Sequence, residues 1–148
     1  MTMKIKLYSI YLALVCSVIL YSCSSSKDNS GIAPETGDYS FTFSDSAGTK
    51  LIEGTLTLKT VENGKISGSY KNSTVYDSTF SAYNLLKGGK FSGTYKANGD
   101  VGFNMNPLLA DNNVYVGAKV SGDNISGNWS QTTMTGSKAK GKFTAALK

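Results

Sequence analysis

The 148-residue sequence contains no histidine and no arginine, and both of its cysteines lie among the first 23 residues. Without histidine there is no imidazole base, which excludes Ser-His-Asp and Cys-His catalysis and histidine metal sites. Without arginine there is no bidentate group for phosphate or guanine, so the basic isoelectric point does not indicate a nucleic-acid partner. We therefore predict a protein that is not an enzyme, uses no cofactor or metal ion and binds no nucleic acid.

The first 22 residues have the pattern of a secretory signal peptide. Two lysines precede a mostly apolar run over residues 7–21. This run is shorter than the roughly 20 apolar residues of a transmembrane helix, and the polar stretch SSSKDNSG follows Cys23 directly. The pattern predicts that residues 1–22 are cleaved from the mature protein.

The segment LYSC, residues 20–23, resembles a bacterial lipobox, in which an aliphatic residue and a small residue precede the cysteine that is acylated. Leu20, Ser22 and Cys23 occupy these three positions. Cys16 follows a bulky valine and is the poorer candidate. The resemblance implies lipidation of Cys23 and a membrane partner reached through its acyl chains, whose methylenes each contribute about 0.8 kcal/mol when buried. An ordinary secretory signal with two incidental cysteines is the alternative.

Residues 23–37 are small and polar, and we predict that they form a flexible tether behind the lipidated cysteine. Lys27-Asp28 resembles the Lys-acidic export signal of Bacteroidetes-type surface lipoproteins; a solvated charge pair in a linker is the alternative. The predicted location is the cell envelope, anchored to the outer membrane on its periplasmic or its surface-exposed face.

A short motif occurs three times in the rest of the chain, as GKISGSY (64–70), GKFSGTY (89–95) and DNISGNW (123–129). Apolar and polar residues alternate in each copy, which is typical of a strand with one buried face. The glycine falls on the apolar side every time. Since glycine weakens a strand interior, its repetition predicts the close approach of a neighbouring strand or a tight bend where a barrel wall curves.

The same alternation extends over much of the remaining sequence. Five further stretches show it, at residues 39–44, 52–58, 101–105, 114–120 and 139–147, and an apolar stretch at 75–86 has no clear phase. Turn dipeptides between the stretches predict tight hairpins. They are Asn63-Gly64, Gly88-Gly89, Asn98-Gly99 and Gly122-Asp123. We predict one all-β domain over residues 38–148, a single up-and-down antiparallel meander of about eight strands closed into a small β-barrel, because closure removes unpaired edges.

The glycine-spaced aromatic motif and the domain length resemble the calycin group, the small barrels of lipocalin-like and avidin-like proteins. The resemblance covers about residues 37–148 and implies a small apolar or glycan ligand at the barrel mouth. Tyr70, Tyr95 and Trp129 end the three copies of the motif and are the candidate ligand-binding residues. If the three aromatic rings lie together at one level of the barrel, that level at the mouth would form a ligand-binding site, whereas at mid-barrel it would be a layer of the hydrophobic core.

A protein-interaction lipoprotein, such as a hydrolase inhibitor or an accessory subunit of an envelope complex, is the alternative function. An eight-strand barrel is just wide enough to be filled by its own side chains or to hold one small ligand. The predicted inward side chains are bulky, but the glycines remove side chains from the wall. The sequence leaves the choice between a filled and a hollow interior open.

Two surface features complete the sequence-based analysis. Lys138, Lys140 and Lys142 alternate on the outer face of the last predicted strand, as a solubilising edge or a binding ridge. Asp45-Ser46-Ala47 and Asp77-Ser78-Thr79 resemble O-glycosylation sites of Bacteroidetes periplasmic proteins; chance matches are the alternative.

The acyl anchor leads to a direct prediction. The Cys23→Ala substitution should move the protein from the membrane to the soluble fraction, because the acyl chains supply its membrane affinity. Cys16→Ala is the matched control and should leave the protein in the membrane fraction. Fractionation followed by immunoblotting measures both, and a Cys23→Ala protein that stays with washed membranes would exclude acylation at this residue as the anchor.

Overall fold

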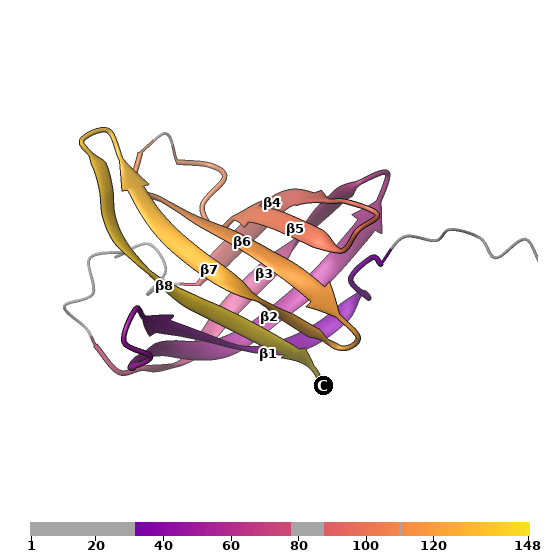
Figure 1. Cartoon of the computed structure of the whole chain (residues 1–148), viewed down its shortest axis with the longest axis horizontal. Coiled ribbons are helices and arrows are strands. Elements are labelled where there is room, and N and C mark those ends of the chain that lie inside the picture. Colours follow the sequence, from indigo (N-terminus) through magenta and orange to yellow (C-terminus); the bar gives the residue numbers. More distant parts are fainter. Residues whose placement is uncertain (1–31, 78–87, 110) are drawn as a thin grey trace, which may run out of the picture. The chain divides into compact units, whose positions relative to one another are not determined.

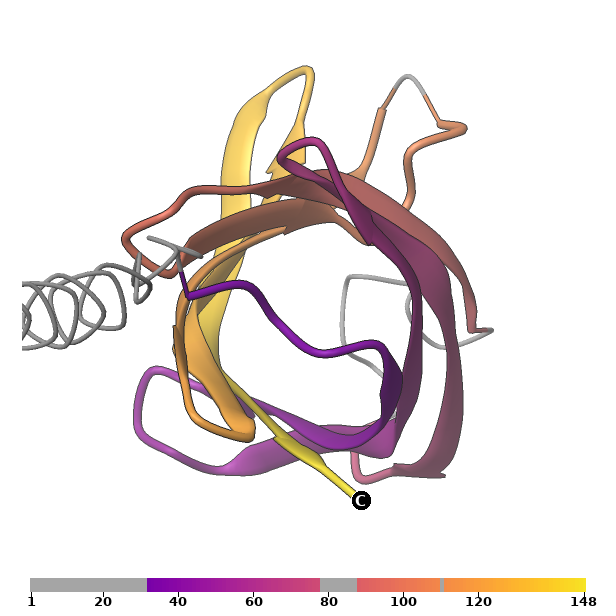
Figure 2. The same ribbon diagram turned by 90° about the vertical axis from the view of Figure 1, so that its right-hand side faces the viewer.

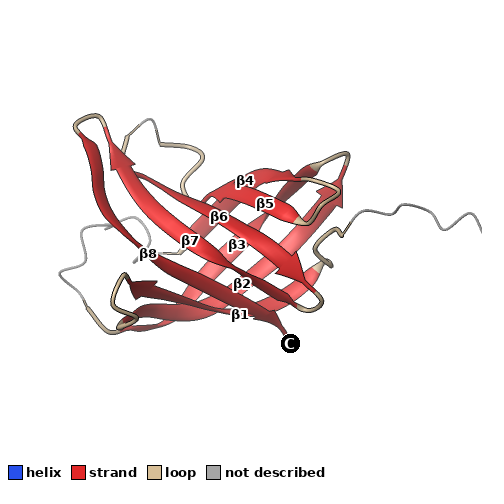
Figure 3. Ribbon diagram, viewed as in Figure 1, coloured by secondary structure: helices blue, strands red, loops and turns tan. Residues whose placement is uncertain are grey.

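The computed structural model describes residues 32–77, 88–109 and 111–148. The predicted signal peptide (residues 1–22), the predicted acylation site Cys23 and residues 24–31 of the predicted tether lie outside these ranges, as do residues 78–86 of the apolar stretch without a clear phase. The described chain consists of strands and loops (Figure 3). None of its residues belongs to a helix with the length and hydrophobicity that a membrane span needs.

Eight antiparallel strands form the domain (Figure 1). Each strand pairs with the next in sequence, and β1 also pairs with β8, so the sheet closes into a barrel. The predicted all-β meander and its closure are therefore confirmed. The strands are β1 (Gly37–Asp45), β2 (Lys50–Glu62), β3 (Lys65–Val75), β4 (Gly89–Tyr95), β5 (Asp100–Asn104), β6 (Asn113–Ser121), β7 (Asn124–Thr133) and β8 (Gly136–Leu147).

The barrel interior is the hydrophobic core, and the alternation of each strand decides which residues enter it. In β1, Tyr39, Phe41 and Phe43 are all buried, while the residues between them face outward. The buried apolar side chains come from all eight strands, as the period of two predicts. Each fully buried large apolar side chain contributes about 1.5–3 kcal/mol.

The glycines of the repeated motif lie where neighbouring strands approach each other most closely. A Cβ atom at Gly68 would lie 2.0 Å from the carbonyl oxygen of Thr57, and one at Gly127 would lie 2.2 Å from that of Gly117. No side chain fits at such a distance, so the predicted close approach is confirmed. The inward-facing glycines with a carbonyl oxygen this close are Gly54, Gly68, Gly93, Gly127 and Gly141.

Two of the predicted turns join strands directly. Asn63 and Gly64 both have positive φ angles, of 50° and 73°, and connect β2 to β3. The two residues Gly122 and Asp123 connect β6 to β7.

The prediction of a tight turn at Gly88-Gly89 is wrong. β3 ends at Val75, and Gly89 is the first residue of β4, where it pairs with Tyr70. Gly88 has a φ of 73°, and a Cβ there would lie 2.9 Å from Tyr70 O, whereas a Cβ at Gly89 would make ordinary van der Waals contact with the Tyr70 ring at 3.4 Å.

The two ends of the barrel differ. The N-terminal end holds the turns that join β2 to β3, β4 to β5 and β6 to β7, and the segment Ile32–Thr36 crosses its opening before β1 begins (Figure 2). The Ile32 amide donates a hydrogen bond to Ala97 O (3.0 Å), and Pro34 is buried. Residues 32–36, within the range predicted as tether, therefore contact the barrel. We call the opposite end, with the β1–β2, β5–β6 and β7–β8 connections, the loop end.

The close approach at inward glycines predicts a contrast between two glycines. A Cβ at Gly141 would lie 1.9 Å from Ser44 O and 2.7 Å from the Trp129 indole nitrogen, whereas one at Gly117 meets no atom within 4 Å. We expect Gly141→Ala to lower the free energy of unfolding by about 1–3 kcal/mol, as overpacking does. Gly117→Ala should be neutral or raise it by up to about 1 kcal/mol.

Urea unfolding of the full chain, followed by tryptophan fluorescence, measures both variants. Equal losses at the two positions would show that close packing of the barrel wall is not what requires the glycine.

Candidate functional site

Aromatic side chains occupy the middle of the barrel. Phe91 packs on Phe103, with ring centroids 5.3 Å apart, and Phe103 packs on Phe143 at 5.6 Å. Phe143 contacts Phe43 at 5.1 Å, and Phe43 contacts Trp129 at 5.8 Å. This chain of contacts links β4 and β5 to β1, β7 and β8, so it crosses the barrel interior. The Phe103–Phe143, Phe43–Phe143 and Phe43–Trp129 pairs are edge-to-face. Such pairs add about 0.5–1.5 kcal/mol each beyond their buried area.

Trp129, a predicted ligand-binding residue, lies in this cluster. Its side chain is 1% exposed, and its indole N–H donates a hydrogen bond to Ser44 O at 2.8 Å. The ring lies against Gly141 on the neighbouring strand, where no side chain competes for the space. Trp129 is thus packed as a core residue with a satisfied polar group.

The other two predicted ligand-binding residues occupy different environments. Tyr70 is 4% exposed and packs edge-on against Phe41, whereas Tyr95 is only half-buried. Tyr70 pairs with the first residue of β4, Gly89, and Tyr95 is the last residue of that strand. The two tyrosines are therefore about 20 Å apart along the strand direction. The structure does not bring the three rings together as one belt, and their binding roles stay a prediction.

Glu53 forms an ion pair with Lys50 on the surface of the barrel. It accepts hydrogen bonds from the Lys50 ammonium group and the Tyr76 hydroxyl, both at 2.6 Å. These bonds, with Lys50 first, hold the pKa of Glu53 below its usual value. The bonding keeps the carboxylate ionised as a hydrogen-bond acceptor on the surface, which does not suit a general acid. No motif in the sequence indicates these two hydrogen-bond partners of Glu53.

The structure describes the acceptor residue of one of the two predicted glycosylation sites. Ser46 lies exposed in the β1–β2 turn, where its hydroxyl donates to Lys140 O at 3.3 Å. The second predicted site includes Ser78 and Thr79, which lie outside the described residues.

The β5–β6 connection at the loop end is held by polar side chains. Asp111 Oδ1 accepts hydrogen bonds from the backbone amides of Asn112 (2.7 Å) and Met134 (2.8 Å). The second bond ties the connection to the β7–β8 hairpin. Asn113 donates to Leu109 O at 3.1 Å, and the buried Gln131 donates to the side chain of Asn112. These bonds fix the path of the connection.

Large apolar side chains project from this connection and from the hairpin beside it. Leu108 is 86% exposed, Leu109 45% and Met134 88%. We call these three residues the loop-end patch. Both segments project from the same part of the loop end in two perpendicular views (Figure 1, Figure 2). Exposed apolar side chains gathered on surface loops are typical of an interaction site. Sequence reasoning missed this patch. The signal that could have indicated it is the apolar pair Leu108-Leu109 between turn residues.

Comparison of the chain with models of known protein families, with curated proteins and with solved structures finds no match.

The burial of Tyr70 makes the stability of the domain depend on pH. Burial raises the pKa of Tyr70 to about 12, whereas an exposed tyrosine has a pKa of about 10. The unfolded chain therefore loses this proton before the folded chain does. We expect the free energy of unfolding to fall as the pH rises from about 10 to about 12.

Tyr70→Phe isolates this contribution, because burial also raises the pKa of Tyr39. The difference in unfolding free energy between the native chain and Tyr70→Phe should be constant below about pH 10 and should shrink above it. Urea unfolding at a series of pH values measures it. A difference that does not change with pH would mean that water solvates the Tyr70 hydroxyl.

Proposed function

We propose that this protein is a lipid-anchored lipoprotein of the cell envelope that acts as a non-catalytic interaction module and binds a partner protein through the loop-end patch. The observation that carries the proposal is the nearly complete exposure of Leu108 and Met134 on segments whose path is fixed by hydrogen bonds. A hydrolase inhibitor or an accessory subunit of an envelope complex would use such a surface.

The packing of the interior favours this function over a small apolar or glycan ligand at the barrel mouth. The aromatic cluster occupies the middle of the barrel, and Ile32–Thr36 crosses the opening at the N-terminal end. Two of the three candidate ligand residues, Tyr70 and Trp129, are almost fully buried. The proposed calycin-like character therefore concerns the architecture, an eight-strand meander barrel, and not a ligand in its interior.

The energetics of the loop-end patch suit a protein partner. Complete burial of one large apolar side chain is worth about 1.5–3 kcal/mol. Ordering a flexible loop on binding would oppose this gain. Here the hydrogen bonds of Asp111 and Asn113 order the connection when the domain folds, so less of the gain is lost on binding.

The predicted anchor fits the position of this surface. Eight residues, 24–31, lie between the predicted acylation site, Cys23, and Ile32. Fully extended, they reach about 30 Å. Ile32 lies at the N-terminal end of the barrel, and the patch lies at the other end. An anchor at Cys23 would hold the N-terminal end close to the membrane and leave the loop end for a partner.

Site-specific photo-crosslinking in the native cells tests the proposal. A photoreactive residue in place of Met134 should give a discrete adduct with one protein, and Leu108→Ser should reduce its yield. The same photoreactive residue in place of Asp123, an exposed residue of the β6–β7 turn at the N-terminal end, is the matched control and should give no such adduct. Leu108→Ser should change stability by less than about 0.5 kcal/mol, because the side chain is exposed.

Adducts with lipid alone at Met134, or the same protein adduct from position 123, would contradict the proposed role of the loop-end patch.

A further inference from the structure

One wall of the barrel carries positive charge alone. The strands β6, β7 and β8 lie side by side and contain no aspartate or glutamate. Lys119, Lys138, Lys140 and Lys142 are all exposed on their outer face. Among the described residues, none of these ammonium groups forms an ion pair. Like charges in neighbouring positions repel one another, so an anion on this wall would relieve that repulsion.

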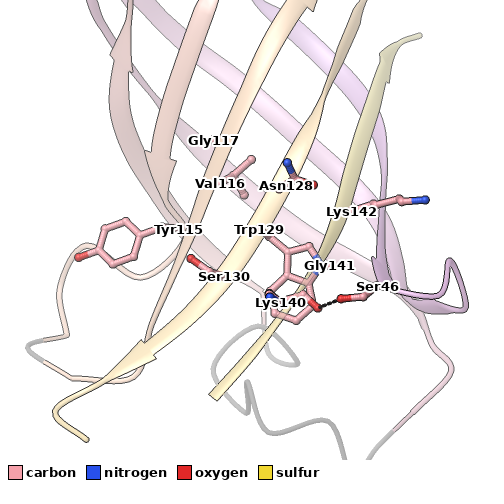
Figure 4. A pocket seen from close by; sticks show the side chains of 10 residues that line it. All are labelled: Ser46, Tyr115, Val116, Gly117, Asn128, Trp129, Ser130, Lys140, Gly141 and Lys142. Carbon is pink, nitrogen blue, oxygen red and sulfur yellow. Dashed lines mark hydrogen bonds between the residues drawn. The ribbon is translucent and has the colours of Figure 1, made fainter. Parts of the chain in front are cut away.

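A groove of about 720 Å³ crosses this wall (Figure 4). Tyr115 of β6 lies on one side of it, with 46% of its side chain exposed, and Lys140 and Lys142 of β8 lie on the other. Gly117 creates the space, because its outward position carries no side chain and a Cβ there would meet nothing within 4 Å. The hydrogen bond from Ser46 to Lys140 O ties the β1–β2 turn to the edge of the groove.

The groove also offers unused hydrogen-bonding groups. Asn128 and Ser130 of β7 lie between the tyrosine and the lysines. Within the described part of the chain, the side chains of Asn128, Ser130 and Tyr115 form no hydrogen bond. An amide and two hydroxyl groups can donate and accept hydrogen bonds at the same time. This combination matches a ligand that carries several hydroxyl groups as well as negative charge.

We propose that the groove binds an acidic oligosaccharide. The Tyr115 ring packs on the apolar face of a sugar ring, Asn128 and Ser130 hydrogen-bond its hydroxyl groups, and Lys140 and Lys142 pair with its carboxylate or sulfate groups. This site is separate from the loop-end patch and does not depend on the function proposed for that patch.

The shape of the wall favours a sugar over an anionic membrane surface. Peripheral binding to a membrane combines cationic residues with apolar side chains that insert among the lipids. In β6, β7 and β8, Tyr115 is the one large apolar side chain that is exposed, and it borders a groove. The groups of β7 that would bind hydroxyls lie between the flanking strands, where a chain of sugar rings can reach them.

Calorimetric titration of the full chain in a neutral detergent tests the site with two probes, a galacturonic acid tetrasaccharide and a sulfated heparin tetrasaccharide. At least one should bind, and for a galacturonate ligand the methyl-esterified tetrasaccharide should bind at least about tenfold more weakly, because the ester removes the charge and keeps the ring. Failure of both acidic probes to bind would overturn the proposal, as would equal binding of the ester when galacturonate is the acidic probe that binds.

Matched variants locate the binding. Lys140→Gln with Lys142→Gln should weaken binding at least about tenfold. Lys71→Gln with Lys90→Gln makes the same change in net charge on exposed positions of β3 and β4, and should leave binding unchanged. Gly117→Val keeps every charge but fills the groove, so it should weaken binding to a similar extent while the unfolding midpoint stays the same or rises.

Two results would show that the lysines of this wall serve a role other than binding an oligosaccharide. Equal weakening by both lysine pairs, or native affinity in Gly117→Val, would mean attraction by net charge without a site. A preference for phosphatidylglycerol over phosphatidylcholine vesicles, lost in the Lys140/Lys142 variant and kept in the Lys71/Lys90 variant, would assign the wall to a membrane surface. Either result would overturn the oligosaccharide site.

Discussion

The close approach of neighbouring strands at the inward-facing glycines is the constraint on which the rest of the barrel depends. A Cβ atom at Gly68 would lie 2.0 Å from a carbonyl oxygen of the neighbouring strand, and one at Gly141 would lie 1.9 Å from another. The space above each glycine is taken by an aromatic ring from the adjacent strand, Phe91 over Gly68 and Trp129 over Gly141. At these two positions the absence of a side chain both lets the strands approach each other and makes room for a ring.

Aromatic rings pack against one another inside the barrel, and the two proposed recognition surfaces lie on its outside. The two surfaces described above differ in chemistry: the loop-end patch is apolar, and the wall of β6, β7 and β8 is cationic. The patch lies on connections between strands, where side chains can change with little effect on the barrel. The groove lies on the strands, where Gly117 sets its depth from within a regular ladder of hydrogen bonds. The strand scaffold holds the groups of the groove in fixed positions.

The sequence was sufficient to predict the strands, their buried faces and the closed meander, because a period of two and turn residues are local properties. It was insufficient for Gly88-Gly89, because the same dipeptide can form a two-residue turn or end a longer connection such as the one between β3 and β4. Tyr70 and Tyr95 have equivalent places in the motif, but successive strands run in opposite directions and are staggered. The loop-end patch depends on the bond between Asp111 and Met134, residues far apart in sequence, which no local pattern reveals.

The pairing of β1 with β8 means that the barrel can close only after the whole chain has been synthesised. β1 finds its second neighbour only after every other strand has been synthesised. Such distant pairing has high contact order and forms slowly, and until β8 arrives both β1 and β7 present an open edge. For a chain exported through its N-terminus, as proposed, the barrel cannot close before translocation is complete. Pairing of β8 with β1 would therefore close the barrel only after the chain has crossed the membrane.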